Sequence, residues 1–242
     1  MTRAVSSNQT KTSLSVIVPV YNEEALINDA VEHLVKTASQ WVDDLEIILV
    51  NDGSKDSSPA IIDQLAEKHD MVRALHQSPN KGFGATVRKG YEAATKELVT
   101  YCPADHHFTA EEFDAFLVLI KYADVVIGYR RHRRIELPFF NWMVSSGYHA
   151  LISILYRLNF YDVNWIHLYH RNQIDSFLGK SDGVFLLAET LINANKKGLR
   201  VVGVDVQYVE RQAGTPTGVQ PKTIFKTLKE VFDFYFHQGR QS

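Results

Sequence analysis

The sequence predicts an α/β domain built on a mostly parallel central sheet. Short apolar runs rich in Val, Ile and Leu alternate with helical patterns through the first half of the 242-residue chain. The runs are apolar along nearly their whole length, which is typical of strands covered on both faces. Polar clusters follow several of these runs. Because the carboxyl ends of parallel strands meet at one edge, we expect the clusters to share a single crevice.

Strand and helix patterns alternate regularly in the first half. Ala25, Ala30, Leu34 and Val35 are candidate inward residues of the first helix, and Asp56 or Ser57 can cap the second helix. In chain order, the pattern predicts a strand at 14–21, a helix at 24–39, a strand at 45–50, a helix at 56–69, a strand at 72–76, a helix at 82–94, a strand at 98–102, a helix at 110–121 and a strand at 124–130.

The second half has a different character, with many aromatic residues. Residues 138–160 predict one long or two short amphipathic helices. After them the pattern predicts a strand at 165–169, a helix at 185–197, a strand at 200–210, a turn-rich loop at 214–218 and a last helix at 223–237. We expect a disordered arm at 1–12 and a single domain at 13–242.

Composition excludes several classes of protein. Apolar residues make up 45% and charged residues 22%, the balance of a globular protein. The net charge of −2 argues against a nucleic-acid partner, which would favour a basic stripe. Cys102 is the single cysteine, so no intrachain disulfide forms, and we expect an inert buried thiol. No segment has the apolar core of a signal peptide or the ~18-residue run of a spanning helix, which predicts a cytoplasmic protein.

Two polar clusters carry the first chemical signal. Pro19 and Tyr21 at the first strand end can line a slot for a nucleoside base, and Glu23 can bind polar ligand groups. At the second strand end, Asp52 can accept a hydrogen bond from a base N–H, while Gly53 permits a tight turn. Each cluster alone also describes an ordinary strand end or turn. The two on successive strands are far more specific.

At these motifs the chain resembles the family-2 glycosyltransferases, which have the Rossmann-like GT-A fold of nucleotide-diphosphosugar transferases. The matching stretches are VPVYNEE, LVNDGSKDSS, NKGFGATVRKGYEAA and PADHHF. Later stretches, ADVVIGYR, DVNWIHLYHR, LLAETL and YVERQAG, resemble polyprenyl-phosphate sugar transferases such as the dolichyl-phosphate mannose synthases. The resemblance implies a donor-binding half at 13–130, and an acceptor-side half with C-terminal amphipathic helices at 131–242.

The resemblance also implies a role for each matching residue. The nucleotide-sugar site comprises Pro19, Tyr21, Glu23, Asp52, Gly53, Lys81, Gly82, Ala104 and Asp105. The residues that face the diphosphate or the acceptor phosphate are Arg130, Arg134 and Arg211. The residues expected to act in catalysis are Asp105, Glu189 and Arg211. Glu189 would be a general base or would orient the acceptor, unless it is a helix-face carboxylate paired with a basic residue.

Two departures from the family pattern concern metal and phosphate binding. Asp105 matches the last acid of the family's Asp-x-Asp metal motif, but Pro103 replaces the first. Asp105 and His107 together can still hold Mn²⁺, or Mg²⁺ less readily, since imidazole suits the softer ion. His107 is otherwise a polar loop residue. After Arg211, Thr-Pro-Thr stands where the family often has Ser-Lys, so the grip on phosphate is expected to differ.

The implied reaction is inverting transfer of a sugar from a UDP- or GDP-linked donor to a polyprenyl phosphate. An arginine cluster after residue 129 suits a phosphate acceptor. The aromatic helices can rest on the inner face of a membrane, as a peripheral attachment, or can form a core or a homodimer seam.

Three other functions fit part of the sequence. The first keeps the donor site but uses a soluble hydroxyl acceptor, such as a glycan or a metabolite. The second, motivated by Pro103, is a nucleotide-sugar-binding protein that has lost catalysis. The third, a nucleotidyltransferase, normally needs a glycine-rich loop directly after the first strand, where this chain has Tyr-Asn-Glu-Glu.

Overall fold

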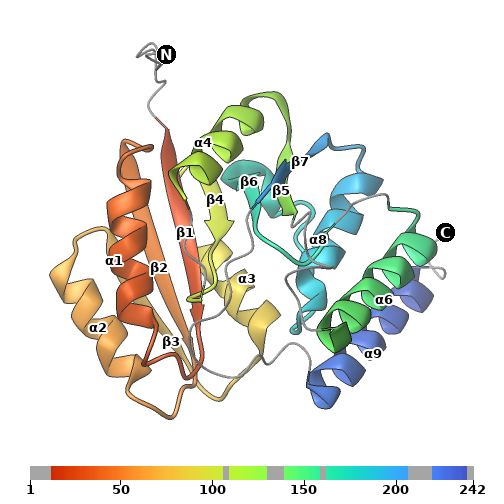
Figure 1. Cartoon of the computed structure of the whole chain (residues 1–242), viewed down its shortest axis with the longest axis horizontal. Helices are drawn as coiled ribbons and strands as arrows, with labels where there is room; N and C mark the ends of the chain where they lie inside the picture. The colour runs from red at the N-terminus through yellow and green to blue at the C-terminus, as the bar shows by residue number, and fades with distance from the viewer. Residues whose placement is uncertain (1–11, 106–108, 130–138, 159–161, 207–219, 239–242) are drawn as a thin grey trace.

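The computed structural model describes residues 12–105, 109–129, 139–158, 162–206 and 220–238. Its strands form a seven-stranded sheet in the order β3-β2-β1-β4-β6-β5-β7 (Figure 1). Strand β6 runs antiparallel to both neighbours, and the other pairings are parallel. The strands are β1 Ser13–Val20, β2 Asp44–Asp52, β3 Val72–Gln77, β4 Leu98–Tyr101, β5 Val125–Tyr129, β6 His167–His170 and β7 Val201–Asp205. The predicted α/β fold with a mostly parallel sheet is therefore confirmed.

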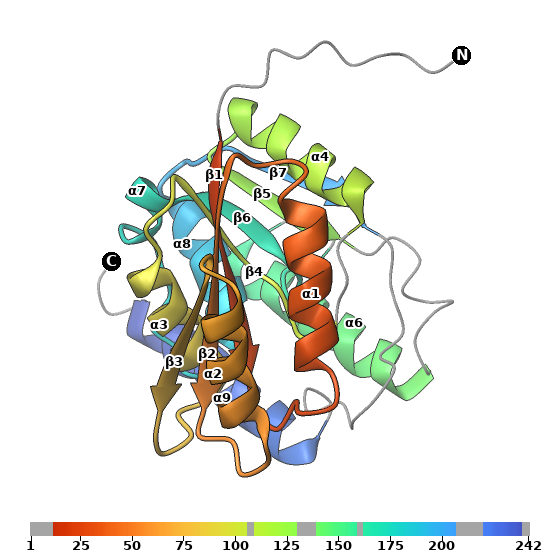
Figure 2. The same cartoon turned by 90° about the vertical axis from the view of Figure 1, so that its left-hand side faces the viewer.

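Helices cover both faces of this sheet. The helices are α1 Ile27–Ala38, α2 Ser58–Lys68, α3 Phe83–Ala93, α4 Ala110–Leu119, α6 Phe139–Tyr156, α7 Arg171–Ile174, α8 Phe185–Lys196 and α9 Pro221–Gln238, with a 3₁₀ turn at Ile120–Tyr122. Figure 2 shows α1, α2 and α4 on one face and α3 and α8 on the other. Helix α9 packs against α8, and α6 runs beside α9 at the edge of the molecule (Figure 1).

The core lies between the sheet and these two helical layers. Consecutive residues of β1 and β2, such as Val16, Ile17 and Ile47, are completely buried, because helices cover the sheet on both sides. Burying each such side chain contributes about 1.5–3 kcal/mol. Gly90 of α3 lies directly on Ile17, so closely that a Cβ atom there would collide with the isoleucine. This close approach packs α3 directly against β1.

Helix α1 begins at Ile27, three residues later than the sequence pattern predicts. Backbone amides in the preceding segment donate to side chains that follow β2 instead of starting the helix. The Asn22 amide donates to Ser54 Oγ at 3.0 Å, and the Glu23 amide donates to Ser58 Oγ at 2.9 Å. These contacts join the ends of β1 and β2 into one rigid polar rim.

Other boundaries also differ, and β7 ends at Asp205, well before the end of the strand predicted at 200–210. Residues 139–156 form one helix, which decides between the two predicted arrangements. The short helix α7 was not predicted, because four residues carry no periodicity. Ser57 occupies the N-cap position of α2 but its side chain makes no cap bond, and Asp56 Oδ1 accepts from the Ser58 amide at 3.0 Å. The predicted arm at 1–12 lies outside the described residues except for its last position.

A buried carboxylate ties the amino-terminal ends of three strands together. Glu46 of β2 accepts from Ser15 Oγ and from Arg73 Nη1, both at 2.6 Å, and from the Thr95 amide at 3.0 Å. Burial alone would raise the pKa of the Glu46 carboxyl, but these hydrogen bonds outweigh burial and lower that pKa. The carboxylate therefore stabilises the fold in its ionised form.

None of the helices in the described parts of the chain combines the length and the apolar character that crossing a membrane requires.

Candidate functional site

A cavity of about 410 Å³ opens at the carboxyl ends of β1, β2 and β4. We call it the polar cavity. Three carboxylate residues from separate segments, Glu23, Asp52 and Asp105, line it. The other predicted nucleotide-sugar residues on its wall are Pro19, Tyr21, Gly82 and Ala104. The structure thus brings residues from three strand ends to one place.

A second hollow of about 740 Å³ adjoins the polar cavity. Tyr21 and Asn80 line both, so the Tyr21 ring, which is 41% exposed, stands between them. Gly53 lines the second hollow and adopts φ +69°, a left-handed conformation that favours glycine. A Cβ atom there would lie only 3.0 Å from the Asn80 amide nitrogen. Gly53 therefore serves the tight turn, as the sequence predicts.

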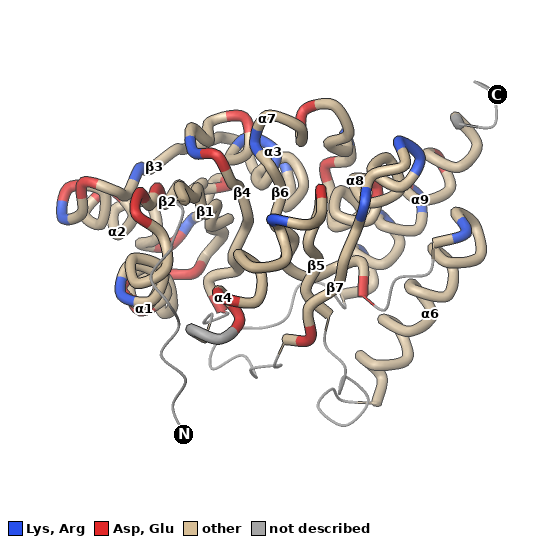
Figure 3. The backbone as a smooth tube through the Cα atoms, turned by 90° about the horizontal axis from the view of Figure 1, so that it is seen from above, with Lys and Arg blue, Asp and Glu red and all other residues tan. Residues whose placement is uncertain are grey.

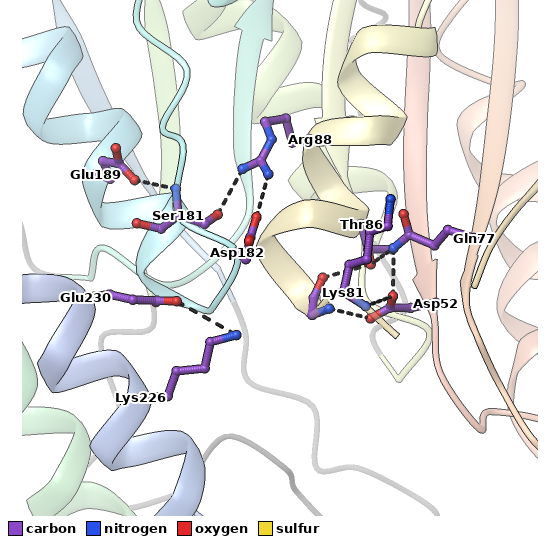
Figure 4. A network of polar contacts seen from close by, with 11 residues as sticks. Asp52, Gln77, Lys81, Thr86, Arg88, Ser181, Asp182, Glu189, Lys226 and Glu230 are labelled. Carbon is purple, nitrogen blue, oxygen red and sulfur yellow. Dashed lines mark hydrogen bonds and ion pairs between the residues drawn. The ribbon is translucent and has the colours of Figure 1, made fainter. Parts of the chain in front are cut away.

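Asp52 ends β2 and anchors the loop before α3. Its carboxylate accepts from Gln77 Nε2 and from the Lys81 amide, both at 2.7 Å, and from the Gly82 amide at 2.9 Å (Figure 4). The residue is only 3% exposed. The described partners of Asp52 are therefore protein groups, and its first effect is to fix where α3 begins. Lys81 contributes its backbone amide here, and as a residue it is exposed and does not line the polar cavity.

Asp105, which the sequence analysis matches to the last acid of the family's metal motif, lines the polar cavity. Pro103 also lines the wall, so the position of the missing first acid faces the same space. In the described residues, no group of three or more His, Cys, Asp or Glu side chains could hold a metal ion. Burial raises the pKa of the Cys102 thiol, and Asp105 and Glu112 raise it further, so a thiolate ligand is unavailable. These residues fit a cation that one carboxylate shares with substrate oxygens.

Glu189 does not line the polar cavity. It lies on α8, is 4% exposed, and accepts from the Ser181 amide at 2.8 Å through Oε2. Gly179 packs so tightly on it that a Cβ atom would lie 2.9 Å from the same oxygen. The structure places Glu189 beneath the loop at 179–181, where it holds that loop in position.

Four of the predicted residues lie outside the described parts of the chain. They are His107, Arg130, Arg134 and Arg211.

The loop at 181–183 bridges the polar cavity and α3, a contact that the sequence analysis missed. The Gly84 amide donates to the Asp182 carbonyl at 2.9 Å. Arg88 donates to the Ser181 carbonyl at 3.0 Å and to Asp182 Oδ1 at 2.6 Å (Figure 4). A Cβ atom on Gly84 would collide with the carbonyls of Ser181 and Gly183. The paired glycines at the start of α3 were the available signal for this close contact.

Helix α9 also supplies residues that the sequence analysis missed. Lys222 and Lys226 line the polar cavity from the side opposite the strand ends. Their spacing of four residues places both on one face of a helix, which was the signal available in the sequence.

An apolar cavity of about 400 Å³ lies between α6 and α9. Val184 and Thr227 line both this cavity and the polar one, so the two are neighbours. The side chains that give it its apolar character include Met143, Val144, Leu151, Ile224 and Leu228. Helix α6 carries no Lys, Arg, Asp or Glu, and its tube is uncoloured in Figure 3. A charged site and an apolar site therefore meet along α9.

Comparison with known proteins identifies relatives for most of the chain. Residues 15–177 match the family model described as glycosyl transferase family 2. The undecaprenyl-phosphate 4-deoxy-4-formamido-L-arabinose transferase of Proteus mirabilis is 28% identical over 206 residues, which cover 83% of this chain and 61% of that protein. A dolichyl-phosphate beta-glucosyltransferase of Trichomonas vaginalis is 33% identical over 160 residues, 57% of this chain and 45% of that protein. The chain thus covers about three fifths of the length of the Proteus mirabilis protein and less than half of the length of the Trichomonas vaginalis protein.

Solved structures share the fold. Glucosyl-3-phosphoglycerate synthase from Mycobacterium tuberculosis, in complex with Mn²⁺, UDP and phosphoglyceric acid, superposes with a TM-score of 0.71 at 16% identity. The match covers 93% of this chain and 78% of that one. A second crystal structure of that synthase holds Mg²⁺ and UDP, with a TM-score of 0.68 at 16% identity over 92% of this chain and 79% of that one.

Proposed function

Because this chain belongs to glycosyl transferase family 2, we propose that it transfers a sugar, with inversion, from a UDP- or GDP-linked donor to a polyprenyl phosphate. The observation that carries the proposal is the polar cavity, where Glu23, Asp52 and Asp105 meet at the strand ends. Ligands of open α/β sheets bind at this edge. The adjoining apolar cavity supports a lipid acceptor.

The donor is proposed to bind with its nucleoside near Pro19, Tyr21 and Glu23. Tyr21 stands at the boundary of the two hollows, where its exposed ring can contact a base. Asp52 supports this site by fixing the loop at 80–82, because it accepts the amides of Lys81 and Gly82. A contact between Asp52 and the nucleoside base would be additional to these two hydrogen bonds with the loop.

The diphosphate is proposed to lie near Asp105. This carboxylate, with His107, would hold a divalent cation, Mn²⁺ or Mg²⁺. When bound, such a cation neutralises charge that develops on the leaving nucleoside diphosphate. The role of Asp105 is then to orient the diphosphate through the shared ion, since Pro103 supplies no second carboxylate.

The acceptor is proposed to approach from the side of α6 and α9. Prenyl units are hydrocarbon, and the apolar cavity between these helices adjoins the polar cavity at Val184 and Thr227. Two relatives of this chain have names that describe sugar transfer to undecaprenyl phosphate and to dolichyl phosphate. Arg130, Arg134 and Arg211 are proposed to bind the acceptor phosphate.

The proposed reaction does not require a general base. An oxygen of the acceptor phosphate forms a bond to the anomeric carbon as the bond from that carbon to the donor diphosphate breaks, and the nucleoside diphosphate leaves with the electron pair. The acceptor phosphate is already an anion near neutral pH, so no proton has to be removed. The position of Glu189, beneath the loop at 179–181, suits a supporting role and agrees with such a mechanism.

The same helices are proposed to rest on a membrane surface. The exposed large apolar residues of α6 and α9 include Phe139, Phe140, Met143, Ile154, Phe225, Phe232 and Phe236. Aromatic residues favour the headgroup region of a bilayer. Peripheral contact would bring the apolar cavity to the lipid that carries the acceptor.

Sugar transfer tests this proposal. Purified protein is incubated with labelled UDP- and GDP-sugars, extracted polyprenyl phosphate and Mn²⁺, and the label in the lipid phase is measured. We expect label in the lipid phase with one donor class and none without polyprenyl phosphate. Label recovered only on soluble hydroxyl acceptors would favour a transferase that acts on a glycan or a metabolite. Donor binding without transfer to any acceptor would indicate a protein that has lost catalysis.

Asp105→Ala tests the proposed cation site. We expect transfer to fall by about 100-fold or more, since electrostatic stabilisation of a leaving group contributes on that scale. Asp114→Ala, on the exposed side of α4, is the matched control and should keep full activity. Unchanged transfer in the Asp105 variant would remove Asp105 from the mechanism.

A further inference from the structure

Two lysines reach the polar cavity from α9, which the family motifs do not assign to substrate binding. Lys222 and Lys226 both line the cavity that also contains Asp105. The Lys226 ammonium nitrogen lies 3.3 Å from the point where a Cβ atom of Gly82 would be, at the start of α3. Both lysines therefore border the same space as the strand ends, and both are also exposed to solvent.

The positive charge of these lysines is only weakly neutralised by the protein. Lys226 Nζ lies 3.9 Å from Glu230 Oε1, near the outer limit of an ion pair. Lys222 makes no hydrogen bond or ion pair with the part of the chain that the structure describes. Burial raises the pKa of the Glu230 carboxyl, although Lys226 and the backbone of Gly183 offset part of this.

Helix α9 is fixed in a position that keeps the lysines over the cavity. The Glu230 carboxylate packs on Gly183, where a Cβ atom would collide with it, and Gly183 itself lines the polar cavity. Farther along the helix, Tyr156 Oη donates to the Val231 carbonyl at 2.7 Å, and Phe234 packs on the Tyr156 ring at 5.8 Å. These contacts hold the C-terminal half of α9, directly beyond the two lysines.

Two exposed lysines that line the wall of a cavity suit a substrate that carries phosphate. Lysine binds phosphoryl oxygens as a compact point charge. The need for such charge is greater here than in a site with two metal-binding carboxylates, because Pro103 occupies the place of the first acid. The start of α3, beside Lys226, adds the positive end of a helix dipole to the same region.

We propose that Lys222 and Lys226 of α9 bind the phosphate groups of the substrate. Their positive charge would replace part of the charge of a cation that a second metal-binding carboxylate would help to hold. This inference rests on the proposed function, because it requires a phosphate-bearing substrate in the polar cavity. The phosphoryl oxygens belong either to the donor diphosphate or to the acceptor phosphate. Both sources present the same chemistry to an ammonium group.

Titration calorimetry in the presence of EDTA isolates the contribution of the lysines from that of any cation. UDP and GDP are titrated into wild-type protein, Lys226→Gln and the double variant Lys222→Gln/Lys226→Gln. If the lysines bind the donor diphosphate, the Kd of the nucleoside diphosphate should rise about tenfold for each lysine replaced, while binding of the free nucleoside stays constant. Lys229→Gln is the matched control, because Lys229 is exposed on the same helix and does not line the cavity.

A second titration with farnesyl phosphate separates the two sources of phosphate. Weaker binding of the nucleoside diphosphate alone assigns the lysines to the donor, and weaker binding of farnesyl phosphate alone assigns them to the acceptor. Lys226→Arg keeps the charge and should retain most of the affinity. Equal unfolding temperatures for the Lys226→Gln and Lys229→Gln variants show that weaker binding is not due to unfolding.

Two negative results have different meanings. If the double variant binds both ligands as tightly as wild type does, the lysines have no role in phosphate binding and the inference is wrong. If wild-type protein binds neither nucleoside diphosphate even with Mn²⁺ added, the proposed function itself fails, and the inference fails with it.

Discussion

At the scale of single residues, Asp52 combines a place on the cavity wall with a buried anchoring role. Three donors from two segments converge on its carboxylate, which accepts from Gln77 and from the amides of Lys81 and Gly82. The sequence analysis expected a ligand contact here, and the structure adds the reason why an aspartate suits the position. Asparagine offers only one acceptor oxygen in place of two.

Asp52→Asn is therefore expected to act on stability as well as on binding. Its amide group would face at least one of the three donors and leave a buried N–H unsatisfied, which costs roughly 1–3 kcal/mol. Thermal and urea unfolding measure this effect directly. Asp63→Asn, at an exposed carboxylate, is the control. If Asp52→Asn unfolds like wild type, the hydrogen bonds seen at Asp52 do not stabilise the fold.

Glu46 gives a prediction about pH. Its pKa is lower in the folded protein than the ordinary value of 4.5, so its ionised form stabilises the fold above that pH, and the stabilisation is lost as the pH falls through the folded pKa. Glu46→Gln should cost about 2 kcal/mol near pH 7. The difference from wild type should shrink below pH 4.5.

Urea unfolding of wild type and Glu46→Gln at several pH values measures this difference. The matched control is Glu67→Gln, at an exposed position of α2. A free-energy difference between wild type and Glu46→Gln that stays constant down to pH 3 would contradict the assigned role of the carboxylate.

At the scale of elements, the contact between α3 and the loop at 181–183 positions both walls of the polar cavity. It depends on Gly84, because any larger residue would meet two carbonyl oxygens. Gly84→Ala should destabilise the protein by about 1–3 kcal/mol, as overpacking usually does. Gly147→Ala is the matched control. It is also within a helix, but nothing lies within 4 Å of its Cβ position, so it should be neutral or slightly stabilising.

Chemical unfolding curves for the two glycine variants measure this difference in stability. Equal stability of Gly84→Ala and Gly147→Ala would mean that the loop at 181–183 yields easily, and that it does not define the cavity wall.

The order of strands and helices could be predicted from the sequence more fully than their spatial relations. Continuous apolar runs identified β1 and β2, because strands buried on both faces need no polar alternation. Pairing at long range carries no such local signal. The insertion of β6 between β4 and β5, antiparallel to both, depends on which edges remain open after the other strands have paired.

The residues of the candidate site likewise divide into those that the sequence predicts and those that depend on long-range packing. Pro19, Glu23 and Asp105 could be predicted because they lie at or shortly after the carboxyl ends of strands, and topology brings these ends together. Lys222 and Lys226 could not, because their place at the cavity depends on how α9 docks far along the chain. Glu189 looked like an acid for catalysis in the sequence, and only its packing against Gly179 reveals the loop that it holds.

At the scale of the whole molecule, the polar and apolar cavities meet along α9, whose outer face is aromatic. Replacing Phe225, Phe232 and Phe236 by serine should weaken binding to phosphatidylglycerol vesicles by about tenfold or more, since each exposed ring buries apolar area in the interface. Co-sedimentation with the vesicles measures the effect. Tyr122→Ser, at a residue 67% exposed after α4, is the control. Equal sedimentation of wild type and the triple variant would mean that the aromatic face of α9 does not bind these vesicles.

The central claim is that a nucleoside diphosphate occupies the polar cavity between Asp52 and Asp105. A thermal-shift panel with UDP, GDP and their sugars, each with and without Mn²⁺, tests it most directly, because a ligand that binds the native state alone raises the unfolding temperature. We predict a concentration-dependent rise with one of the two nucleotides, larger with Mn²⁺ and reduced in Asp105→Ala. An unfolding temperature that no nucleotide changes, at concentrations up to the millimolar range, would contradict the claim.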